Sequence, residues 1–355
     1  MTDALPTGAT IGILGGGQLG RMLSVAASRL GFKTHIFEPG AEPPAGHVAD
    51  RVTTATYHDH VALTAFAGNV DVVTYEFENI PTSALDTIEK TTPIRPGREA
   101  LRVSQDRLVE KTFLRDLGLN VAPFADVTSL DVLLLAVQEI GTPAILKTRR
   151  FGYDGKGQAR LKTDDDVDAA WAEMADQAAI LEGFVDFSLE ISVIAARSPQ
   201  GDVACYDPGE NVHRDGILHT TTVPARLSAA MRTDAILIAA KILNALDYVG
   251  VLGVELFVTQ EGLIVNEIAP RVHNSGHWTQ NGCTVDQFEQ HIRAVAGWPL
   301  GNGARHSDVT MENLIGADMD RVSDLAKEVN CAMHLYGKSE TKPGRKMGHV
   351  NRVTA

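Results

Sequence analysis

The sequence predicts an α/β protein: a parallel β-sheet in the N-terminal third, then an α+β segment, then mainly antiparallel strands. From residue 9 to about residue 102, short apolar runs alternate with helical patterns, which is typical of parallel strands joined by crossover helices. The first apolar run leads into the glycine-rich stretch GGGQLG and then into a helical pattern. After about residue 188, strand-like runs follow one another with one long helical pattern between them.

The N-terminal third contains short apolar runs that predict strands, separated by segments with apolar residues at helical spacing. The expected strands are Thr10–Leu14, Lys33–Phe37, Arg51–Thr53 and Val70–Tyr75. The expected helices are Leu19–Leu30, His58–Ala67 and Thr82–Lys90. Proline and glycine between residues 38 and 46 predict a loop after the second strand.

The remainder of the chain divides where its pattern changes. Helices are expected at Asp106–Leu117, Leu130–Ile140 and Thr233–Leu246. Strands are expected at Ala144–Thr148, Ala179–Glu182 and Ser188–Ala196, and a hairpin at Val251–Val258 and Leu263–Ile268. We therefore expect three domains, at residues 1–105, 106–187 and 188–355.

Composition and charge restrict the class of protein. The chain has 355 residues and a net charge of -13, so we expect no nucleic-acid partner, because a polyanion would be repelled. No apolar run reaches the ~18 residues of a membrane span, and residues 1–10 lack the regions of a signal peptide. We expect no membrane partner and a cytoplasmic location. Cys205, Cys283 and Cys331 are scattered and odd in number, which favours reduced, buried thiols.

Gly15, Gly17 and Gly20 form the pattern Gly-x-Gly-x-x-Gly between an expected strand and an expected helix. Glu38 follows at the end of the second expected strand, and together these residues are typical of a dinucleotide site. A second interpretation is that the loop binds any phosphate or polar group at the N-terminus of the helix. The loop alone leaves both interpretations open.

Two glutamates fall opposite each other in the expected C-terminal hairpin. We expect Thr259 to pair with Leu263, with Gly262 in a three-residue loop. In this register Glu255 lies directly across from Glu267. Two carboxylates ~4 Å apart repel by about 4 kcal/mol at an effective dielectric constant of 20, and Mg²⁺, which prefers carboxylate and phosphate oxygens, would remove this repulsion. Two solvated glutamates on the outer face are the alternative.

A second glycine-rich loop, KTRRFGYDGKGQ, runs from Lys147 to Gln158 between two expected strands. It is not a Walker A loop, because neither serine nor threonine follows Lys156 and no helix comes next. Its glycines leave backbone amides able to close on phosphate oxygens. We expect the loop to be mobile without nucleotide, because ordering each residue costs about 1–2 kcal/mol. A flexible surface hairpin is the alternative.

In their order along the chain, several motifs resemble those of the 5-(carboxyamino)imidazole ribonucleotide synthases of the ATP-grasp superfamily. The motifs are GGGQLGRM, YEFENIP, SQDR, GYDGKGQ, NEIAPRVHNSGH and HLYGKSETKPGRKMGHV. The resemblance implies an ATP-grasp fold with an N-terminal Rossmann-like domain (1–105), a lid (106–187) and a C-terminal domain with the metal site (188–355). It implies a ligase of de novo purine biosynthesis, in which ATP and bicarbonate form carboxyphosphate. The exocyclic amine of 5-aminoimidazole ribonucleotide takes the carboxyl group, directly or from released CO₂, and ADP and phosphate are formed.

The resemblance also implies a role for each matching residue. ATP would be bound by Arg107, Lys147, Gly152, Tyr153, Asp154, Gly155, Lys156, Gly157, Gln158, Glu182, Gly183, Phe184, Val185, Glu190, His213, Asn266 and Glu267, with residues 182–185 as the adenine hinge. The ribonucleotide would be bound by Gln18, Leu19, Glu76, Tyr153, Asp154, Lys338, Arg345 and Lys346. Mg²⁺ would be bound by Glu255 and Glu267, and the catalytic residues that hold bicarbonate and carboxyphosphate would be Arg271, His273 and Asn274.

The first glycine loop then belongs to the substrate side, where we expect the ribonucleotide phosphate at the helix N-terminus near Arg21. The expected partners are ATP, bicarbonate and 5-aminoimidazole ribonucleotide, and the resemblance implies a homodimer. Three other classes stay open: a formate-dependent glycinamide ribonucleotide transformylase, a nicotinamide dehydrogenase and a non-catalytic ATP-binding regulator. The presence of Glu255, Glu267, Lys147 and Arg271 argues against the regulator. The histidines lack paired helical spacing, which argues against a zinc site.

Overall fold

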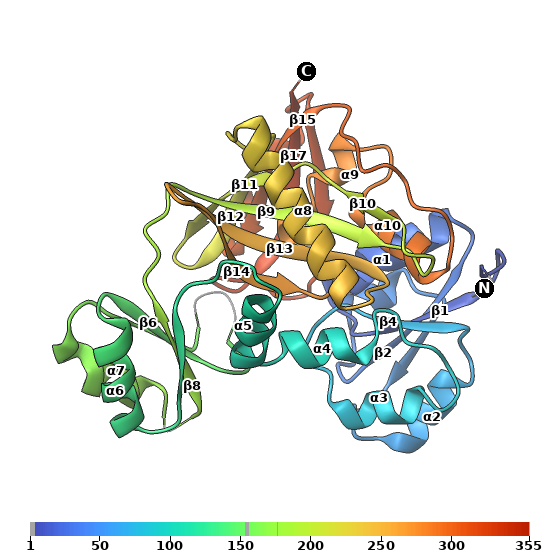
Figure 1. Ribbon diagram of the computed structural model, residues 1–355. Helices are drawn as coiled ribbons and strands as arrows, with labels where there is room; N and C mark the ends of the chain where they lie inside the picture. Colours follow the sequence, from blue (N-terminus) through green and yellow to red (C-terminus); the bar gives the residue numbers. More distant parts are fainter. Residues whose placement is uncertain (1–3, 153–155, 176, 355) are drawn as a thin grey trace.

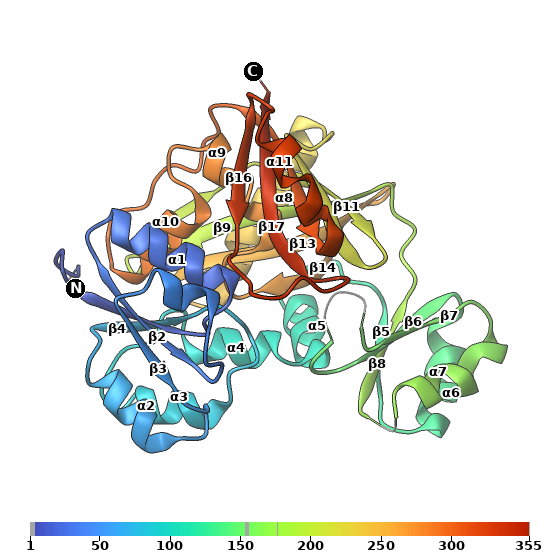
Figure 2. The same cartoon turned by 180° about the vertical axis from the view of Figure 1, so that it is seen from behind.

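The computed structural model describes residues 4–152, 156–175 and 177–354. Its strands form three sheets, and each sheet takes its strands from one of the three segments expected from the sequence. Figures 1 and 2 show the second sheet with its two helices standing away from the rest of the molecule as a separate lobe. Within the described ranges, every helix is too short or too polar to cross a membrane.

The N-terminal sheet is parallel, as predicted. Its strands are β1 (Thr10–Leu14), β2 (Lys33–Glu38), β3 (Arg51–Thr54) and β4 (Val72–Tyr75), in the order β3-β2-β1-β4. Its helices are α1 (Gln18–Arg29), α2 (His60–Ala67) and α3 (Thr82–Ile88), with a 3₁₀ turn η1 (Pro44–His47). Because neighbouring strands run the same way, Glu38 at the end of β2 and Glu76 after β4 lie at one edge of the sheet, beside the glycine loop.

Two helices lead out of the first sheet, α4 (Arg98–Ser104) and α5 (Arg107–Asp116). Asp106 begins α5 as its N-cap and accepts hydrogen bonds from the amides of Leu108 and Val109. The sequence places α5 with the second domain, but Leu114 of α5 packs into the hydrophobic core of the largest sheet. One face of α5 is therefore attached to that sheet.

The second sheet is antiparallel and has a core of its own. Its strands are β5 (Phe124–Val127), β6 (Ala144–Thr148), β7 (Gln158–Leu161) and β8 (Ala179–Gly183), in the order β5-β8-β6-β7. Its helices are α6 (Leu130–Ile140) and α7 (Val167–Glu173), the latter after a 3₁₀ turn η2 (Asp164–Asp166). Leu133 of α6 and Ala170 of α7 pack with Leu146 and Leu181 in one cluster. The lobe therefore has its own core.

The largest sheet is antiparallel, in the order β14-β13-β9-β11-β12-β15-β17-β16 with β10 beside β9. Its strands are β9 (Leu189–Arg197), β10 (Val203–Cys205), β11 (Gly209–Arg214), β12 (Ile217–Val223), β13 (Gly250–Thr259), β14 (Gly262–Ala269), β15 (Asp308–Ile315), β16 (Cys331–Leu335) and β17 (Lys346–Thr354). Its helices are α8 (Ala229–Ala245), α9 (Thr279–Gly282), α10 (Gln287–Val295) and α11 (Val322–Leu325), with 3₁₀ turns η3 (Asn274–Gly276) and η4 (Gly316–Arg321).

Helices cover this sheet from two sides. Helix α8 packs with β9, β13 and β14 in one core cluster. A second cluster joins Leu23 of α1, Ile194 of β9 and Ile292 of α10. Helix α10, which the sequence analysis did not predict, therefore fills the space between the largest sheet and the N-terminal domain. Its His291 accepts the Val251 amide at 3.0 Å through Nδ1 and lies 2.8 Å through Nε2 from the Thr74 hydroxyl of β4.

The hairpin of β13 and β14 brings Glu255 opposite Glu267, as expected. The expectation for its turn is wrong: Thr259 pairs with Gly262, not with Leu263, so the loop has two residues instead of three. The register then shifts by one residue before Glu255 is reached. The offset at the turn and the shift in the strand cancel, and the two glutamates meet.

The three cysteines are free thiols. Cys283 is buried, as expected, whereas Cys205 and Cys331 are half-buried. Burial raises the pKa of Cys205 to about 11 and that of Cys283 to about 12, so neither thiol ionises near neutral pH.

Candidate active site

A β-bulge in β14 determines how Glu267 is presented. Leu256 pairs with Val265 and Glu255 pairs with Glu267, so Asn266 is the extra residue. A bulge bends its strand and redirects the side chains next to it. The two glutamates thus face each other at a bend in the sheet, with the amide of Asn266 beside Glu255.

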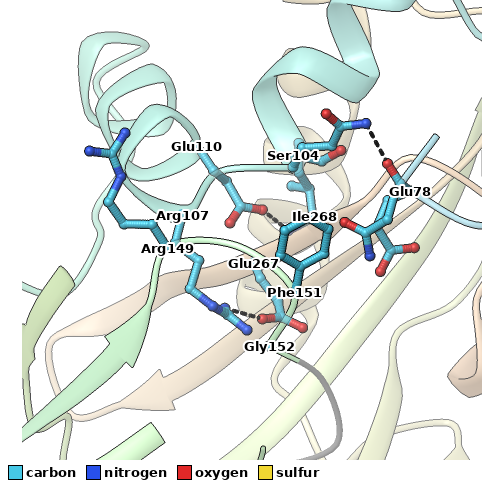
Figure 3. A pocket seen from close by; sticks show the side chains of 11 residues that line it. Glu78, Ser104, Arg107, Glu110, Arg149, Phe151, Gly152, Glu267 and Ile268 are labelled. Carbon is cyan, nitrogen blue, oxygen red and sulfur yellow. Dashed lines mark hydrogen bonds and ion pairs between the residues drawn. The ribbon is translucent and has the colours of Figure 1, made fainter. Parts of the chain in front are cut away.

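Helix α5 contacts all three residues of the bulge, 266–268. Lys111 Nζ donates to the main-chain carbonyl of the first residue at 2.7 Å. Arg107 Nη1 donates to the carboxylate of the second at 2.9 Å, and the carboxylate of Glu110 accepts the amide of the third at 2.7 Å. Figure 3 shows Arg107 and Glu110 directed at this strand. The contacting residues of α5 have the spacing of one helix face, so the helix holds the bulge as a unit.

The carboxyl groups of Glu255 and Glu267 have opposite pKa shifts. Burial, and then the charge of Glu267, raise the pKa of Glu255 to about 7. Burial also disfavours the ionised form of Glu267, but the charge and hydrogen bond of Arg107 outweigh it and lower the pKa of Glu267 to about 2. Arg107 thus stabilises one member of the pair, while the other stays repelled by its neighbour.

Lys147, expected to contact a phosphate, is paired with Glu182. The Lys147 ammonium lies 3.0 Å from Glu182 Oε2, and the buried Lys111 ammonium lies 3.2 Å from the same oxygen. Burial lowers the pKa of Lys147. Burial opposes ionisation of Glu182 as well, but the charges of the two lysines outweigh it and lower its pKa. Two cations therefore share one buried anion beside the bulge.

The expected adenine hinge, residues 182–185, leaves the second lobe at the end of β8. The amide of Gly183 donates to the Pro123 carbonyl at 2.8 Å, and the amide of Phe184 donates to the Pro143 carbonyl at 3.1 Å. These two amides are engaged within the lobe. The ring of Phe184 is 38% exposed and the Arg160 guanidinium lies 4.6 Å from its centroid.

His273 lies next to Glu255, with its Nε2 3.5 Å from Glu255 Oε1. Its Nδ1 is 2.8 Å from the Ser275 hydroxyl. Burial, and then the charge of Arg271, lower the pKa of His273 to about 3. The imidazole is therefore neutral at physiological pH and has one nitrogen to donate and one to accept a hydrogen bond.

The two other residues expected at the oxyanion have partners of their own. Arg271 Nε donates to Glu78 Oε2 at 2.7 Å. The side-chain amides of Asn274 and Asn313 bond to each other in both directions, at 2.9 and 2.7 Å. Glu78 belongs to the YEFENIP stretch, so the N-terminal domain supplies a carboxylate to this part of the site.

Glu190 and His213, expected at the ribose and near ATP, form a close pair, with Oε2 and Nδ1 2.5 Å apart. Burial lowers the pKa of His213, but the hydrogen bond and charge of Glu190 outweigh it and raise the pKa. Of the basic residues expected at the substrate phosphate, Lys346 is close enough for its charge to act on both His213 and His273. Lys338 Nζ donates to the Lys346 carbonyl at 2.7 Å, which links the two lysines.

The third of these basic residues, Arg345, donates to the Glu340 carbonyl at 3.0 Å. Among the residues expected on the other side of the ribonucleotide, Gln18 opens α1 and Leu19 follows it. The side chain of Leu19 packs into the hydrophobic core. Leu19 could therefore meet a ligand only through its main chain.

At the N-terminus of α1, where a phosphate is expected, carboxylates of the chain bond to the loop amides in this structure. Glu76 accepts the amides of Gly17 and Gly20, the latter at 2.6 Å. Glu38 accepts the Gly16 amide at 2.8 Å. These contacts argue against the dinucleotide interpretation, since the amides that would hold a pyrophosphate are bonded to Glu76 and Glu38, and Glu38 is the acid that would hold a ribose.

The second glycine-rich loop, expected to cover the phosphates, is described only in part. Tyr153, Asp154 and Gly155 lie outside the described residues, while Gly152, Lys156, Gly157 and Gln158 lie within them. At its base the Thr148 amide donates to the Gly157 carbonyl at 2.8 Å. Gly157 has φ +71°, in the left-handed region that favours glycine.

A pocket lies beside the bulge (Figure 3). Its lining residues come from α4, α5 and β14 and from the segments that follow β4 and β6. Its lining is Glu78, Asn79, Ser104, Gln105, Arg107, Glu110, Arg149, Phe151, Gly152, Glu267 and Ile268. Sequence reasoning assigned Arg107, Gly152 and Glu267 but missed Glu78, Gln105, Glu110 and Arg149. The available signal was their position, since Glu78 follows β4, Gln105 ends α4, Glu110 lies in the first turn of α5 and Arg149 follows β6.

The comparisons with known families cover nearly the whole chain. Residues 8–105 match the ribonucleotide synthetase preATP-grasp domain, residues 112–288 the ATP-grasp domain, and residues 310–355 the phosphoribosylaminoimidazole carboxylase C-terminal domain. The N5-carboxyaminoimidazole ribonucleotide synthase of Brucella melitensis is 54% identical over 353 residues, which are 99% of this chain and 98% of that protein. The chain belongs to the N5-carboxyaminoimidazole ribonucleotide synthase family. It is an ATP-dependent ligase that carboxylates an aminoimidazole ribonucleotide in purine biosynthesis.

Solved structures of N5-carboxyaminoimidazole ribonucleotide synthases share this fold. An ADP complex of one synthetase is 42% identical, has a TM-score of 0.97, and is matched over 100% of this chain and 94% of that chain. The Aspergillus clavatus enzyme, in complex with ADP and 5-aminoimidazole ribonucleotide, is 31% identical with a TM-score of 0.92 over 98% of this chain and 94% of that chain. The ATP-grasp fold implied by the sequence motifs is thereby confirmed.

Proposed function

We propose that this synthase binds ATP, bicarbonate and 5-aminoimidazole ribonucleotide and transfers the carboxyl group of bicarbonate to the ribonucleotide through carboxyphosphate. Bicarbonate oxygen attacks the γ-phosphorus of ATP, giving ADP and carboxyphosphate. The exocyclic amine then bonds to the carboxyl carbon, directly or after CO₂ is released, while phosphate leaves and the amine loses a proton. The observation that carries this proposal is the facing pair Glu255 and Glu267 beside Arg107 and Lys147.

Mg²⁺ fits the glutamate pair. The charge of Glu267 raises the pKa of Glu255, so the two carboxylates repel each other as they stand. Among the described residues, groups of three or more His, Cys, Asp or Glu arranged to hold a metal ion are absent, so a cation at this pair would complete its shell with phosphate oxygens and water, as Mg²⁺ commonly does. Bound there, the ion would neutralise charge on the transferring phosphoryl group.

The cationic side chains of the site supply the rest of the charge compensation. Arg107, Lys147 and Arg271 each form an ion pair with a carboxylate of the chain. We propose that these three cations also contact the phosphates and bicarbonate when these bind. Phosphoryl transfer needs positioning and charge, not a protein nucleophile. Glu190, paired with His213, would hold the ribose of ATP.

On the acceptor side, we propose that His273 and Asn274 join Arg271 in holding bicarbonate and carboxyphosphate. The ribonucleotide phosphate would bind the basic residues of the C-terminal strand region, Lys338, Arg345 and Lys346, instead of the N-terminus of α1. Gln18, Leu19 and Glu76 would contact the rest of the ribonucleotide. Tyr153 and Asp154, which lie outside the described residues, would line the same site.

We also propose the division into domains at residues 1–105, 106–187 and 188–355, with the second acting as a lid. Carboxyphosphate reacts with water, so a closing lobe that excludes solvent would protect it. A cytoplasmic homodimer is the proposed state. Light scattering on the purified chain tests the dimer, since a monomeric mass would contradict it.

The test of this function is ADP formation with and without each substrate. Turnover is expected only with both bicarbonate and 5-aminoimidazole ribonucleotide, and turnover with formate and glycinamide ribonucleotide would support the rival ligase. Glu267→Ala is expected to lower turnover at least about 10³-fold, on the order of 4 kcal/mol. Glu261→Ala, in the exposed turn of the same hairpin, serves as the control. Unchanged turnover in Glu267→Ala would refute the proposed role of the pair.

A further inference from the structure

Gln287, the first residue of α10, is completely buried, and its side chain is bonded to the main chain of His273 at two points. Its Oε1 accepts the His273 amide at 2.9 Å, and its Nε2 donates to the His273 carbonyl at 2.8 Å. We infer that Gln287 is a positioning residue of the reaction, which holds the loop 273–277 so that the His273 imidazole faces Glu255. The inference rests on the proposed role of this loop in holding bicarbonate and carboxyphosphate.

The orientation of the Gln287 amide is determined by its partners. A main-chain amide can only donate and a carbonyl can only accept, so Oε1 must face the His273 amide and Nε2 the carbonyl. Nε2 also donates to Nδ1 of His277 at 2.9 Å. Burial lowers the pKa of His277 well below its usual range, which keeps that nitrogen able to accept. The Gln287 side chain therefore joins both ends of the loop.

Close packing leaves the loop little room to shift. A Cβ atom on Gly276 would lie 2.6 Å from Gln287 Oε1, and one on Gly253 would lie 2.8 Å from the His273 Cβ. The His273 side chain thus rests directly on the backbone of β13, two residues before Glu255. Residues with side chains at either glycine would push the loop away from the strand that carries the glutamate.

The imidazole ring of His273 is held separately, through Nδ1. His273 Nδ1 lies 2.8 Å from the Ser275 hydroxyl, which lies 2.6 Å from the buried Ser192 hydroxyl. These contacts set the rotation of the ring, whereas Gln287 sets the position of the main chain. Gln287 is completely buried and both ends of its side-chain amide are engaged by His273 and His277, so its effect on the reaction would pass through the loop.

The chain contains a matched control on the same helix. Gln290 is also completely buried, and its amide bonds in the same two-point manner to the main chain of Gly301: Oε1 accepts the amide at 2.8 Å and Nε2 donates to the carbonyl at 2.8 Å. Gly301 lies in the connection between α10 and β15. Replacing Gln290 removes the same kind of contact without touching the His273 loop.

The experiment compares Gln287→Met, Gln287→Glu and Gln290→Met by steady-state kinetics and thermal melting. Both Gln287 variants are expected to raise the KM for bicarbonate at least about tenfold, because a displacement of positioned groups by ~1 Å can cost about 10²-fold. The KM for ATP is expected to change less than about twofold. Gln290→Met is expected to lower the melting temperature comparably and leave the KM for bicarbonate unchanged. Gln287→Glu keeps the acceptor for the His273 amide and the side-chain volume, but it removes the donor to the His273 carbonyl. If Gln287→Met does not fold, Gln287→Glu serves as the test.

An unchanged KM for bicarbonate in a folded Gln287 variant would overturn the inference, as would an equal increase in Gln290→Met. His273→Ala separates this failure from that of the proposed function. If His273→Ala raises the KM for bicarbonate and the Gln287 variants do not, only the inference fails. If His273→Ala leaves it unchanged, the proposed bicarbonate site itself is wrong.

Discussion

Lys111 stabilises a buried glutamate beside the proposed phosphate-binding part of the site. Its ammonium bonds to the Asn266 carbonyl at 2.7 Å and to Glu182 at 3.2 Å, and its side chain is only 1% exposed. Lys147, the second partner of Glu182, is the cation proposed to turn toward phosphate. When it does so, Lys111 keeps the Glu182 carboxylate paired, and a buried carboxylate without a partner would be strongly unfavourable.

Lys111→Met is expected to lower the free energy of unfolding by about 3 kcal/mol, because it leaves the Asn266 carbonyl without its donor and removes one of two cations from Glu182. Urea unfolding followed by circular dichroism measures this. Lys327→Met is the control, since Lys327 pairs with Asp324 at the surface with side chains 75% and 77% exposed, and its loss should be within about 0.5 kcal/mol. Equal losses in the two variants would contradict the buried role.

The hairpin shows how far an element can be predicted from its own residues. The alternation of apolar residues predicted both strands and the facing glutamates, and both are confirmed. The bulge could not be predicted, because it is held by Lys111 and Glu110 of α5, which are 155 and 158 residues away from their partners in the sequence. Glu110 itself has the pattern of an exposed helical residue, yet it is buried and bonded to a backbone amide.

Helix α5 carries the contacts to the bulge on one face, so its N-terminus should affect the site as well as stability. The Asp106 side chain accepts the first amides of α5 and pairs with Arg149 at 2.7 Å. Asp106→Ala is expected to cost about 1–2 kcal/mol in unfolding free energy and to raise the KM for ATP, because α5 then holds Glu267 less firmly.

Ser129→Ala is the matched control for this cap. Ser129 is the N-cap of α6, in the lobe formed by the second sheet, and accepts the Val132 amide. Its loss is expected to cost about 1 kcal/mol and leave the KM for ATP within twofold of the parent. Denaturant unfolding and initial-rate measurements on both variants decide between the two roles. An unchanged KM for ATP in Asp106→Ala would show that α5 is only a structural support.

The sequence predicted the three sheets, but it did not predict the contacts between them. Helix α10 links the largest sheet to the N-terminal domain, and Phe288, Ile292 and Val295 in its sequence QFEQHIRAV are apolar residues at the spacing of one helix face. That pattern would have predicted the helix. The sequence does not show that the polar residues Gln287, Gln290 and His291 are buried as well, because their hydrogen bonds go to backbone groups of distant segments.

Buried neutral histidines determine how the stability of the molecule depends on pH. Six described histidines have a pKa lowered mainly by burial: His35 and His334 to about 4, His273 and His291 to about 3, and His277 and His349 well below the usual range. The unfolded chain takes up these protons near pH 6.5, and the folded chain does not. Their stabilising contribution is therefore complete above about pH 6.5 and is lost as the pH falls toward 4.

Four carboxyl groups act in the opposite direction. Burial raises the pKa of Glu110 to about 8 and that of Glu255 to about 7, and it also raises the pKa of Glu76 and of Asp286. These groups stabilise the fold most at low pH, below the pKa of an unfolded carboxyl group, and less as the pH rises through their folded pKa values. Between pH 4.5 and 6.5 the six histidines outnumber the four carboxyl groups. The net expectation is that the free energy of unfolding decreases as the pH falls from 6.5 to 4.5.

His291→Gln tests this dependence at the junction between the N-terminal domain and the largest sheet. The variant is expected to be less stable at pH 7.5, because the bonds to Val251 and Thr74 are altered. Its stability should fall less steeply between pH 6.5 and 4.5, by up to about 1.4 kcal/mol per pH unit, since one proton fewer is taken up on unfolding. Urea unfolding at several pH values measures both effects, with the exposed His306→Gln as the control. A parent-like slope in His291→Gln would show that His291 is not held neutral by the fold.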